Sequence, residues 1–108
     1  MATVAYELTP LTTLKDRCHV VRWTLSAGDQ GVPIEMSGRA DRSIHFVGTG
    51  SASLQGSNNG TSFVVLTDPG GTPITVSADG IKQIMEGVRY MRPVCTSGTF
   101  DCFLFMKL

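Results

Sequence analysis

Two histidines are the first residues of this sequence that could perform acid–base chemistry or hold a metal ion. His19 and His45 lie in separate strand-like segments, and neither has a partner ligand at a spacing typical of a metal site. Because His45 alternates with Ile44 and Phe46, we expect it to point away from the core as an ordinary surface histidine. The pattern predicts no metal site and no cofactor.

Carboxylates are the next candidates for catalysis. Glu7, Glu35 and Glu86 fall in a tail, a loop and the end of an expected helix, and nothing brings two of them together as glycoside hydrolysis requires. The sequence also has no nucleophile elbow, P-loop or dinucleotide-binding glycine motif. We therefore expect no catalytic residue and a protein that is not an enzyme.

Three cysteines, Cys18, Cys95 and Cys102, form an odd set without CxxC spacing. Such a set is not typical of a disulfide framework, although Cys95 and Cys102 could approach each other across a hairpin. We expect buried thiols in a reducing compartment.

The charges are balanced, with nine Lys plus Arg against nine Asp plus Glu. A neutral chain gives no general attraction to nucleic acid or to an anionic membrane, and no apolar run is long enough to span one. The chain start lacks the pattern of a secretory signal, so we expect synthesis and folding in a cytoplasm. One charged cluster is either a solvated loop or a docking surface: Glu35, Arg39, Asp41 and Arg42.

Composition and periodicity predict an all-β fold, an antiparallel β-sandwich or jelly roll with one short helix. Twelve Gly and 42 % hydrophobic residues suit a domain with many turns. Residues 19–26 alternate, which places Val21, Trp23 and Leu25 on one buried face. In 43–57 we expect two short strands or one interrupted strand, broken at Gly48 and Gly50, with these inward residues: Ile44, Phe46, Ala52 and Leu54.

Turn signals and one helical pattern follow. Asn59-Gly60 predicts a two-residue hairpin turn, and the run from Asp68 to Gly71 predicts a second turn. In 77–87 the apolar residues Ile81, Ile84 and Met85 have helical spacing, so we expect a helix of about two turns.

The two ends of the chain suggest contacts with other molecules. Residues 1–15 are expected to be an arm that can add as a strand to a neighbour, and residues 16–108 a single β-sandwich domain. The final strand is apolar on both faces, since Phe103 and Phe105 alternate with other apolar residues. It lies either at the centre of the sandwich or against a neighbouring subunit.

The run from residue 38 to 98 resembles small proteins that decorate or cement the capsids of tailed bacteriophages. The resemblance rests on "ADRS", "LQGSNNGTSFVVLTDPGG" and "VRYMRPVCTSG" in this order. It implies a homotrimer that assembles in the host cytoplasm, binds the major capsid protein on the outside of the virion and stabilises the head. The spacing of "GSNNGTSF" and "RYMRP" is also similar to the discoidin, or factor V/VIII type C, jelly rolls.

The hypothesis of a capsid decoration protein assigns residues that would contact the capsid or a neighbouring subunit. The capsid-contact candidates are Val4, Tyr6, Leu8, Glu35, Arg39 and Arg42, and the trimer-interface candidates are Phe103 and Phe105. The alternative function is a carbohydrate-binding module of a phage fibre or baseplate.

Overall fold

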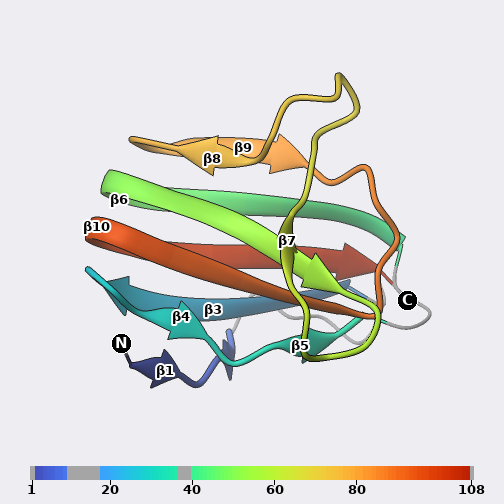
Figure 1. Ribbon diagram of the computed structural model, residues 1–108, viewed down its shortest axis with the longest axis horizontal. Coiled ribbons are helices and arrows are strands. Elements are labelled where there is room, and N and C mark those ends of the chain that lie inside the picture. The colour runs from blue at the N-terminus through green and yellow to red at the C-terminus, as the bar shows by residue number, and fades with distance from the viewer. Residues whose placement is uncertain (1, 10–17, 37–39, 108) are drawn as a thin grey trace.

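The computed structural model describes residues 2–9, 18–36 and 40–107, and all of their regular structure is β. The strands belong to one strongly curled sheet (Figure 1). They are β1 (Thr3–Val4), β2 (Glu7–Leu8), β3 (Cys18–Ser26), β4 (Gln30–Gly31), β5 (Ile34–Glu35), β6 (Ala40–Ser57), β7 (Val64–Val65), β8 (Thr75–Val76), β9 (Gly80–Gln83) and β10 (Tyr90–Lys107).

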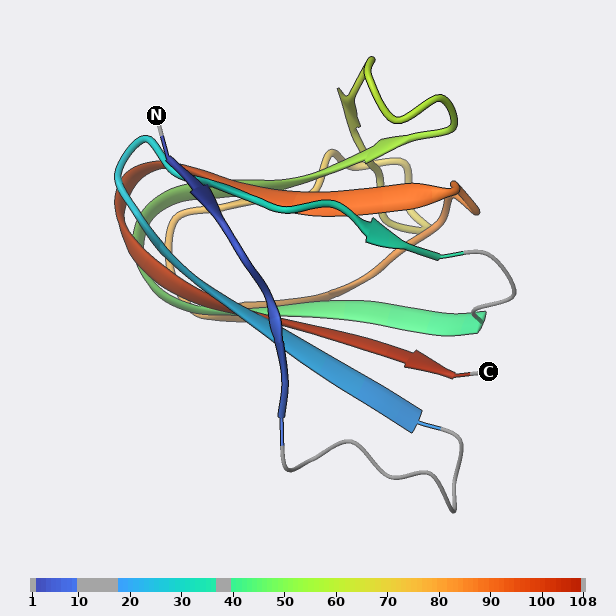
Figure 2. The ribbon, with the colours of Figure 1, turned by 90° about the horizontal axis from the view of Figure 1, so that it is seen from below.

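Two long strands define the shape of this sheet. β6 and β10, of 18 residues each, pair antiparallel along almost their whole length and bend together near the middle (Figure 2). At the bend the two backbones nearly touch, since a Cβ on Gly98 would stand 1.9 Å from the carbonyl oxygen of Thr49. Gly98 also has φ 73°, a conformation that glycine adopts without steric cost. The predicted break in 43–57 is therefore a bend inside one continuous strand.

The bend divides the sheet into two layers. One layer has the order β3, second half of β10, first half of β6, β9. In the other layer, the first half of β10 pairs with β4 and β5, and the second half of β6 pairs with β7 and β8. Figure 2 shows the layers facing each other, joined at the bend.

The N-terminal segment connects the layers along one side. β1 pairs in parallel with β4, and β2 pairs antiparallel with β3. The ring of Tyr6 packs edge-on against Trp23 with 5.6 Å between centroids. In the described part of the predicted arm, residues 3–8 thus add to strands of their own chain, whereas residues 10–15 lie outside the described residues. The physical reason is that β3 and β4 leave unpaired backbone groups at their edges, which this segment satisfies.

The core lies between the layers and confirms the alternation expected from the sequence. Val21, Trp23 and Leu25 are fully buried, and the indole of Trp23 donates a hydrogen bond to the carbonyl of Val32 at 3.1 Å. The four residues expected to point inward from 43–57 are also buried: Ile44, Phe46, Ala52 and Leu54. The all-β class is therefore confirmed.

The predicted helix is wrong. Within 77–87 the structure has the strand β9, whose residues pair with Ser43–Phe46 of β6. Ile84 is buried, but Ile81 and Met85 are exposed, so the three residues do not form one buried helical face. A helix of two turns is marginal by itself, whereas the edge of β6 offers a ready ladder of hydrogen bonds.

The predicted turns are confirmed in position but not in every detail. Residues 58–63 connect β6 to β7, so the turn at Asn59-Gly60 is longer than two residues. The amide oxygen of Asn59 accepts hydrogen bonds from the backbone N–H groups of Thr61 and Ser62 and holds this loop. The turn at Asp68 closes with a hydrogen bond from Gly71 N–H to the Asp68 carbonyl at 2.9 Å.

Candidate functional site

The residues predicted to contact a capsid are spread over the fold. Val4 packs against the core and Tyr6 against Trp23, while Leu8 is exposed on β2. Glu35 is exposed on β5, where it pairs with Tyr90 of β10 in the same layer. Arg42 is half-buried near the start of β6, and Arg39 lies outside the described residues.

The inward face is a packed hydrocarbon core with two thiols. Cys95 and Cys102 are buried there, as expected. Burial raises the pKa of both thiols, and that of Cys102 rises to about 12. They are therefore protonated at neutral pH, which makes them poor nucleophiles and poor metal ligands. Across the described ranges no group of three or more His, Cys, Asp or Glu residues could hold a metal ion.

Two polar atoms at one end of the inward face are buried without a described hydrogen-bond partner. They are Nε2 of His19 and Nε of Arg42. His19 pairs with Met106 on β10, while Arg42 lies beyond that strand on β6, so two strand spacings, roughly 10 Å, separate their backbones. The end of the Arg42 side chain lies instead by Gly87, whose Cβ, if present, would stand 3.3 Å from Nη1. These two groups therefore do not lie close enough together to bind one ligand.

Glu86 has a structural role near this end. Its carboxylate accepts hydrogen bonds from the backbone N–H of Thr67 at 2.9 Å and from its hydroxyl at 2.6 Å. Desolvation alone would raise the pKa of Glu86, but the Thr67 hydrogen bonds and the charge of Arg42 outweigh it and lower the pKa. The carboxylate thus fastens the segment after β9 to the loop that contains Thr67.

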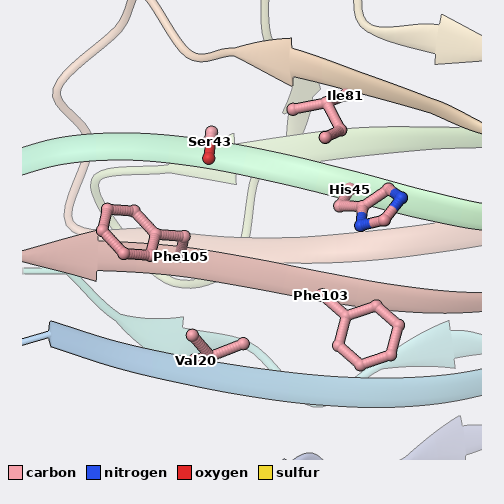
Figure 3. Close-up of a pocket in the computed structure, with 6 residues that line it drawn as sticks. All are labelled: Val20, Ser43, His45, Ile81, Phe103 and Phe105. Atoms are coloured by element: carbon pink, nitrogen blue, oxygen red, sulfur yellow. The ribbon is translucent and has the colours of Figure 1, made fainter. Parts of the chain in front are cut away.

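The outward face carries a groove (Figure 3). It has a volume of about 380 Å³ and lies over the layer β3–β10–β6–β9. Its lining residues come from all four strands: Val20, Ser43, His45, Ile81, Phe103 and Phe105.

Strand register brings these six residues together. Phe103 is opposite His45, which in turn is opposite Ile81. One pleat further along, Phe105 stands between Val20 and Ser43. The rings of His45 and Phe103 are tilted against each other with 5.9 Å between centroids. The predicted outward position of His45 is confirmed, and the structure describes no hydrogen bond to its imidazole.

Charges stand at the rim of the groove and already have partners. Glu7 accepts a hydrogen bond from Nε of Arg22 at 2.8 Å and forms an ion pair with the same guanidinium, which raises the pKa of Arg22. Asp101 accepts a hydrogen bond from the hydroxyl of Thr24 at 2.8 Å. Towards the bend, a second depression of about 240 Å³ adjoins these residues, lined in part by Thr24, Val47 and Asp101.

The sequence indicated only part of this surface. Phe103 and Phe105 were candidates for an interface because their strand is apolar on both faces, and they do point outward. Ile81 was assigned to a helix, while Val20 and Ser43 carried no signal of their own. Ile81 is 64 % exposed, and one exposed isoleucine does not by itself indicate a site. Only the strand register, which places it beside His45, shows that it belongs to the groove.

Searches with the sequence found no matching family profile and no matching curated protein. Solved structures do share the fold. A Klebsiella pneumoniae protein with a double-stranded β-helix domain has TM-score 0.56 at 14 % identity, over 97 % of this chain and 76 % of its own. The cupin domain of an Enterobacter cloacae transcriptional regulator has TM-score 0.55 at 11 % identity, over 95 % and 96 %. A predicted oxalate decarboxylase from Thermotoga maritima has TM-score 0.56 at 12 % identity, over 95 % and 80 %.

The fold is therefore cupin-like, a curled β-barrel of jelly-roll type. The resemblance to phage decoration proteins and to discoidin domains is wrong, because the structural neighbours are consistently cupin or double-stranded β-helix proteins. Capsid decoration, with its glycan-binding alternative, is likewise wrong. The shared turn sequences misled because Asn-Gly and Pro-Gly turns occur in many unrelated β-folds. In the described residues no helix is long and apolar enough to cross a membrane.

Proposed function

We propose that this protein is a non-catalytic binding module with a cupin-like fold, and that it binds through the outward face of the layer β3–β10–β6–β9. The observation that carries the proposal is the apolar groove of about 380 Å³ on that face. Apolar depressions of this size with few polar groups are typical of binding sites. A chain that needed the face only for folding would gain solubility from polar side chains there.

The chemistry of the groove supports binding more than catalysis. His45 is the one titratable residue among the six that line it, and no described carboxylate orients its imidazole. A histidine that activates a nucleophile normally has both a hydroxyl or thiol within hydrogen-bond reach and a third group that fixes its tautomer. Ser43 is two residues away on the same strand, and no hydrogen bond joins its hydroxyl to His45 in the described structure.

The structural neighbours do not indicate which class of function this chain has. One is named as a predicted oxalate decarboxylase and another as a domain of a transcriptional regulator. Because proteins of one fold can have different functions, the function must be inferred from the particular site. In the described residues the inward face holds no group of three or more potential metal ligands, which leaves the outward groove as the candidate binding site.

An environment-sensitive dye tests the proposal. We expect 8-anilinonaphthalene-1-sulfonate to bind the folded protein at 5 µM with increased fluorescence, and Ile81→Ser or Phe105→Ser to reduce the increase several-fold. Ile81 is 64 % exposed, so its replacement leaves the core intact.

The matched control is Val64→Ser. Val64 is 66 % exposed but lies on β7 in the other layer, so its replacement should leave the dye signal unchanged. No dye binding to the folded protein, or equal losses in Val64→Ser and Ile81→Ser, would remove the basis for a binding surface.

A further inference from the structure

The loop between β6 and β7 contains an asparagine whose side-chain oxygen accepts several hydrogen bonds. Oδ1 of Asn59 accepts from the backbone N–H groups of Thr61 at 2.9 Å and Ser62 at 2.8 Å, and from the Thr61 hydroxyl at 3.1 Å. The hydroxyl of Ser57 is a further donor at 2.9 Å. Donors arranged in this way stabilise negative charge on a carbonyl oxygen. The amide carbon of Asn59 is therefore polarised towards attack by a nucleophile.

The nucleophile adjacent to this carbon is the backbone nitrogen of Gly60. Its N–H donates a hydrogen bond to Oγ of Ser57 at 3.0 Å, and the Ser57 hydroxyl donates to Oδ1 of Asn59. Ser57 thus connects the proton that Gly60 must lose with the oxygen that must gain one. Ser57 is only 4 % exposed, so its hydroxyl is held among these partners. Because glycine has no Cβ, its nitrogen can approach a neighbouring side chain closely.

We propose that Asn59 is a site of self-catalysed deamidation, in which Ser57 relays a proton from the Gly60 nitrogen to Oδ1 of Asn59. Asn59 and Gly60 are exposed, so water reaches the site and ammonia leaves it. This inference does not depend on the groove, because the loop leads into β7 in the other layer (Figure 2).

The reaction balances without an oxidant or a cofactor. The Gly60 nitrogen forms a bond to Cγ of Asn59, its proton passes to Oγ of Ser57, and the Ser57 hydroxyl proton passes to Oδ1. The tetrahedral intermediate then re-forms the carbonyl, and the bond from Cγ to the amide nitrogen breaks. Ammonia leaves with the proton of the new hydroxyl, and a cyclic succinimide remains. Water opens this ring at either carbonyl and gives aspartate or isoaspartate.

The two products have different effects on the loop. Aspartate keeps a side-chain oxygen that can accept from Thr61 and Ser62, and it adds one negative charge to a neutral chain. Isoaspartate inserts a methylene group into the main chain and displaces that oxygen. The loop is fastened next to this point, since Oδ1 of Asn58 accepts a hydrogen bond from the backbone N–H of Arg89 at 3.0 Å. The isoaspartate product should therefore loosen the loop, whereas the aspartate product should leave it in place.

Peptide mapping by mass spectrometry during incubation at neutral pH measures the reaction. Asn59 should convert about threefold or more faster in the folded chain than in the same chain unfolded in guanidinium chloride, because only folding assembles the donors. Asn58 is the internal control: it is also exposed, but Asn59 rather than glycine follows it. Asn58 should remain unmodified over the same period.

Three variants test the assigned roles. Ser57→Ala removes the relay and should lower the folded rate to that of the unfolded chain. Thr61→Val removes only the hydroxyl donor of an exposed residue and should lower the folded rate in part, whereas Thr61→Ser keeps the hydroxyl and should keep the rate. In guanidinium chloride all of these chains should react alike, because the hydrogen bonds are absent there.

A folded rate equal to or below the unfolded rate would overturn the proposal, because the hydrogen bonds would then restrain Asn59 instead of activating it. Unchanged folded rates in both Ser57→Ala and Thr61→Val would overturn it as well. Circular dichroism reports whether each variant folds. If Ser57→Ala does not fold, the comparison of Thr61→Val with Thr61→Ser decides the question, since Thr61 is exposed and its replacement leaves the core intact.

Discussion

Replacing Gly98 by alanine tests whether close backbone approach at the bend holds the two layers together. Gly98 has φ 73°, where an alanine costs about 1 kcal/mol relative to glycine. Its Cβ would stand 1.9 Å from the carbonyl oxygen of Thr49 and 2.9 Å from Cα of Gly50. Because these atoms belong to the paired strand, β6 and β10 must separate locally.

The magnitude follows from what that separation breaks. Gly98 pairs with Gly50 and Thr99 with Thr49, so about two ladder hydrogen bonds are lost at about 1 kcal/mol each. Together with the backbone strain, Gly98→Ala should lower the free energy of unfolding by about 3 kcal/mol or more. This is a large share of the roughly 5–15 kcal/mol that stabilises a typical domain.

Urea unfolding followed by circular dichroism measures the effect. We expect the Gly98→Ala midpoint to fall by roughly 1–3 M. The matched control is Gly71→Ala: φ there is 82°, but a Cβ would meet nothing within 4 Å. That variant should lose only the strain of about 1 kcal/mol. Equal losses at Gly71 and Gly98 would refute the argument, because backbone contact at the bend would then contribute nothing.

Three further measurements concern the interior. The pKa of Cys102 is about 12 in the folded chain, against 9.0 for a free thiol, so the unfolded chain loses this proton at a lower pH. The free energy of unfolding should therefore fall as the pH rises from about 9 to 12 and level off above that. Denaturation at pH 8–11 should show a shallower decline in Cys102→Val; an identical decline contradicts the assignment. Zn²⁺ or Mn²⁺ at millimolar concentration should change the melting temperature by less than about 1 °C, because the described interior has no set of metal ligands. A saturable rise of several degrees would contradict this expectation. Trp23→Phe should lower the free energy of unfolding in urea by about 2 kcal/mol, because it leaves the Val32 carbonyl unpaired and opens a cavity beside Tyr6. A loss below about 0.5 kcal/mol would contradict this.

Local patterns predicted the strands well where one face is buried. The alternation in 19–26 placed Val21, Trp23 and Leu25 inward because a pleated strand turns every second side chain to the core. The same period placed Phe46 and Leu54 correctly on either side of the bend. In the last strand Cys102, Leu104 and Met106 are buried for the same reason, but the sequence, apolar on both faces there, did not indicate which face is inward.

Local patterns failed where a distant segment decides the outcome. Ile81, Ile84 and Met85 have helical spacing, yet this stretch became β9 and the segment after it because the edge of β6 was available for pairing. The break expected at Gly48 and Gly50 became a bend because β10 bends beside it in register. No window of neighbouring residues contains that information.

The amino-acid sequence alone determined that this chain forms β-structure, which residues of its main strands face inward, and where several of its turns fall. These properties follow from side-chain alternation and turn chemistry, which act over a few residues. Only the tertiary structure decided the cupin-like curl and the groove, because both depend on the pairing of segments far apart in the chain. Ile81 of β9 lies beside His45 of β6, and Phe105 of β10 lies beside Val20 of β3, solely through that register.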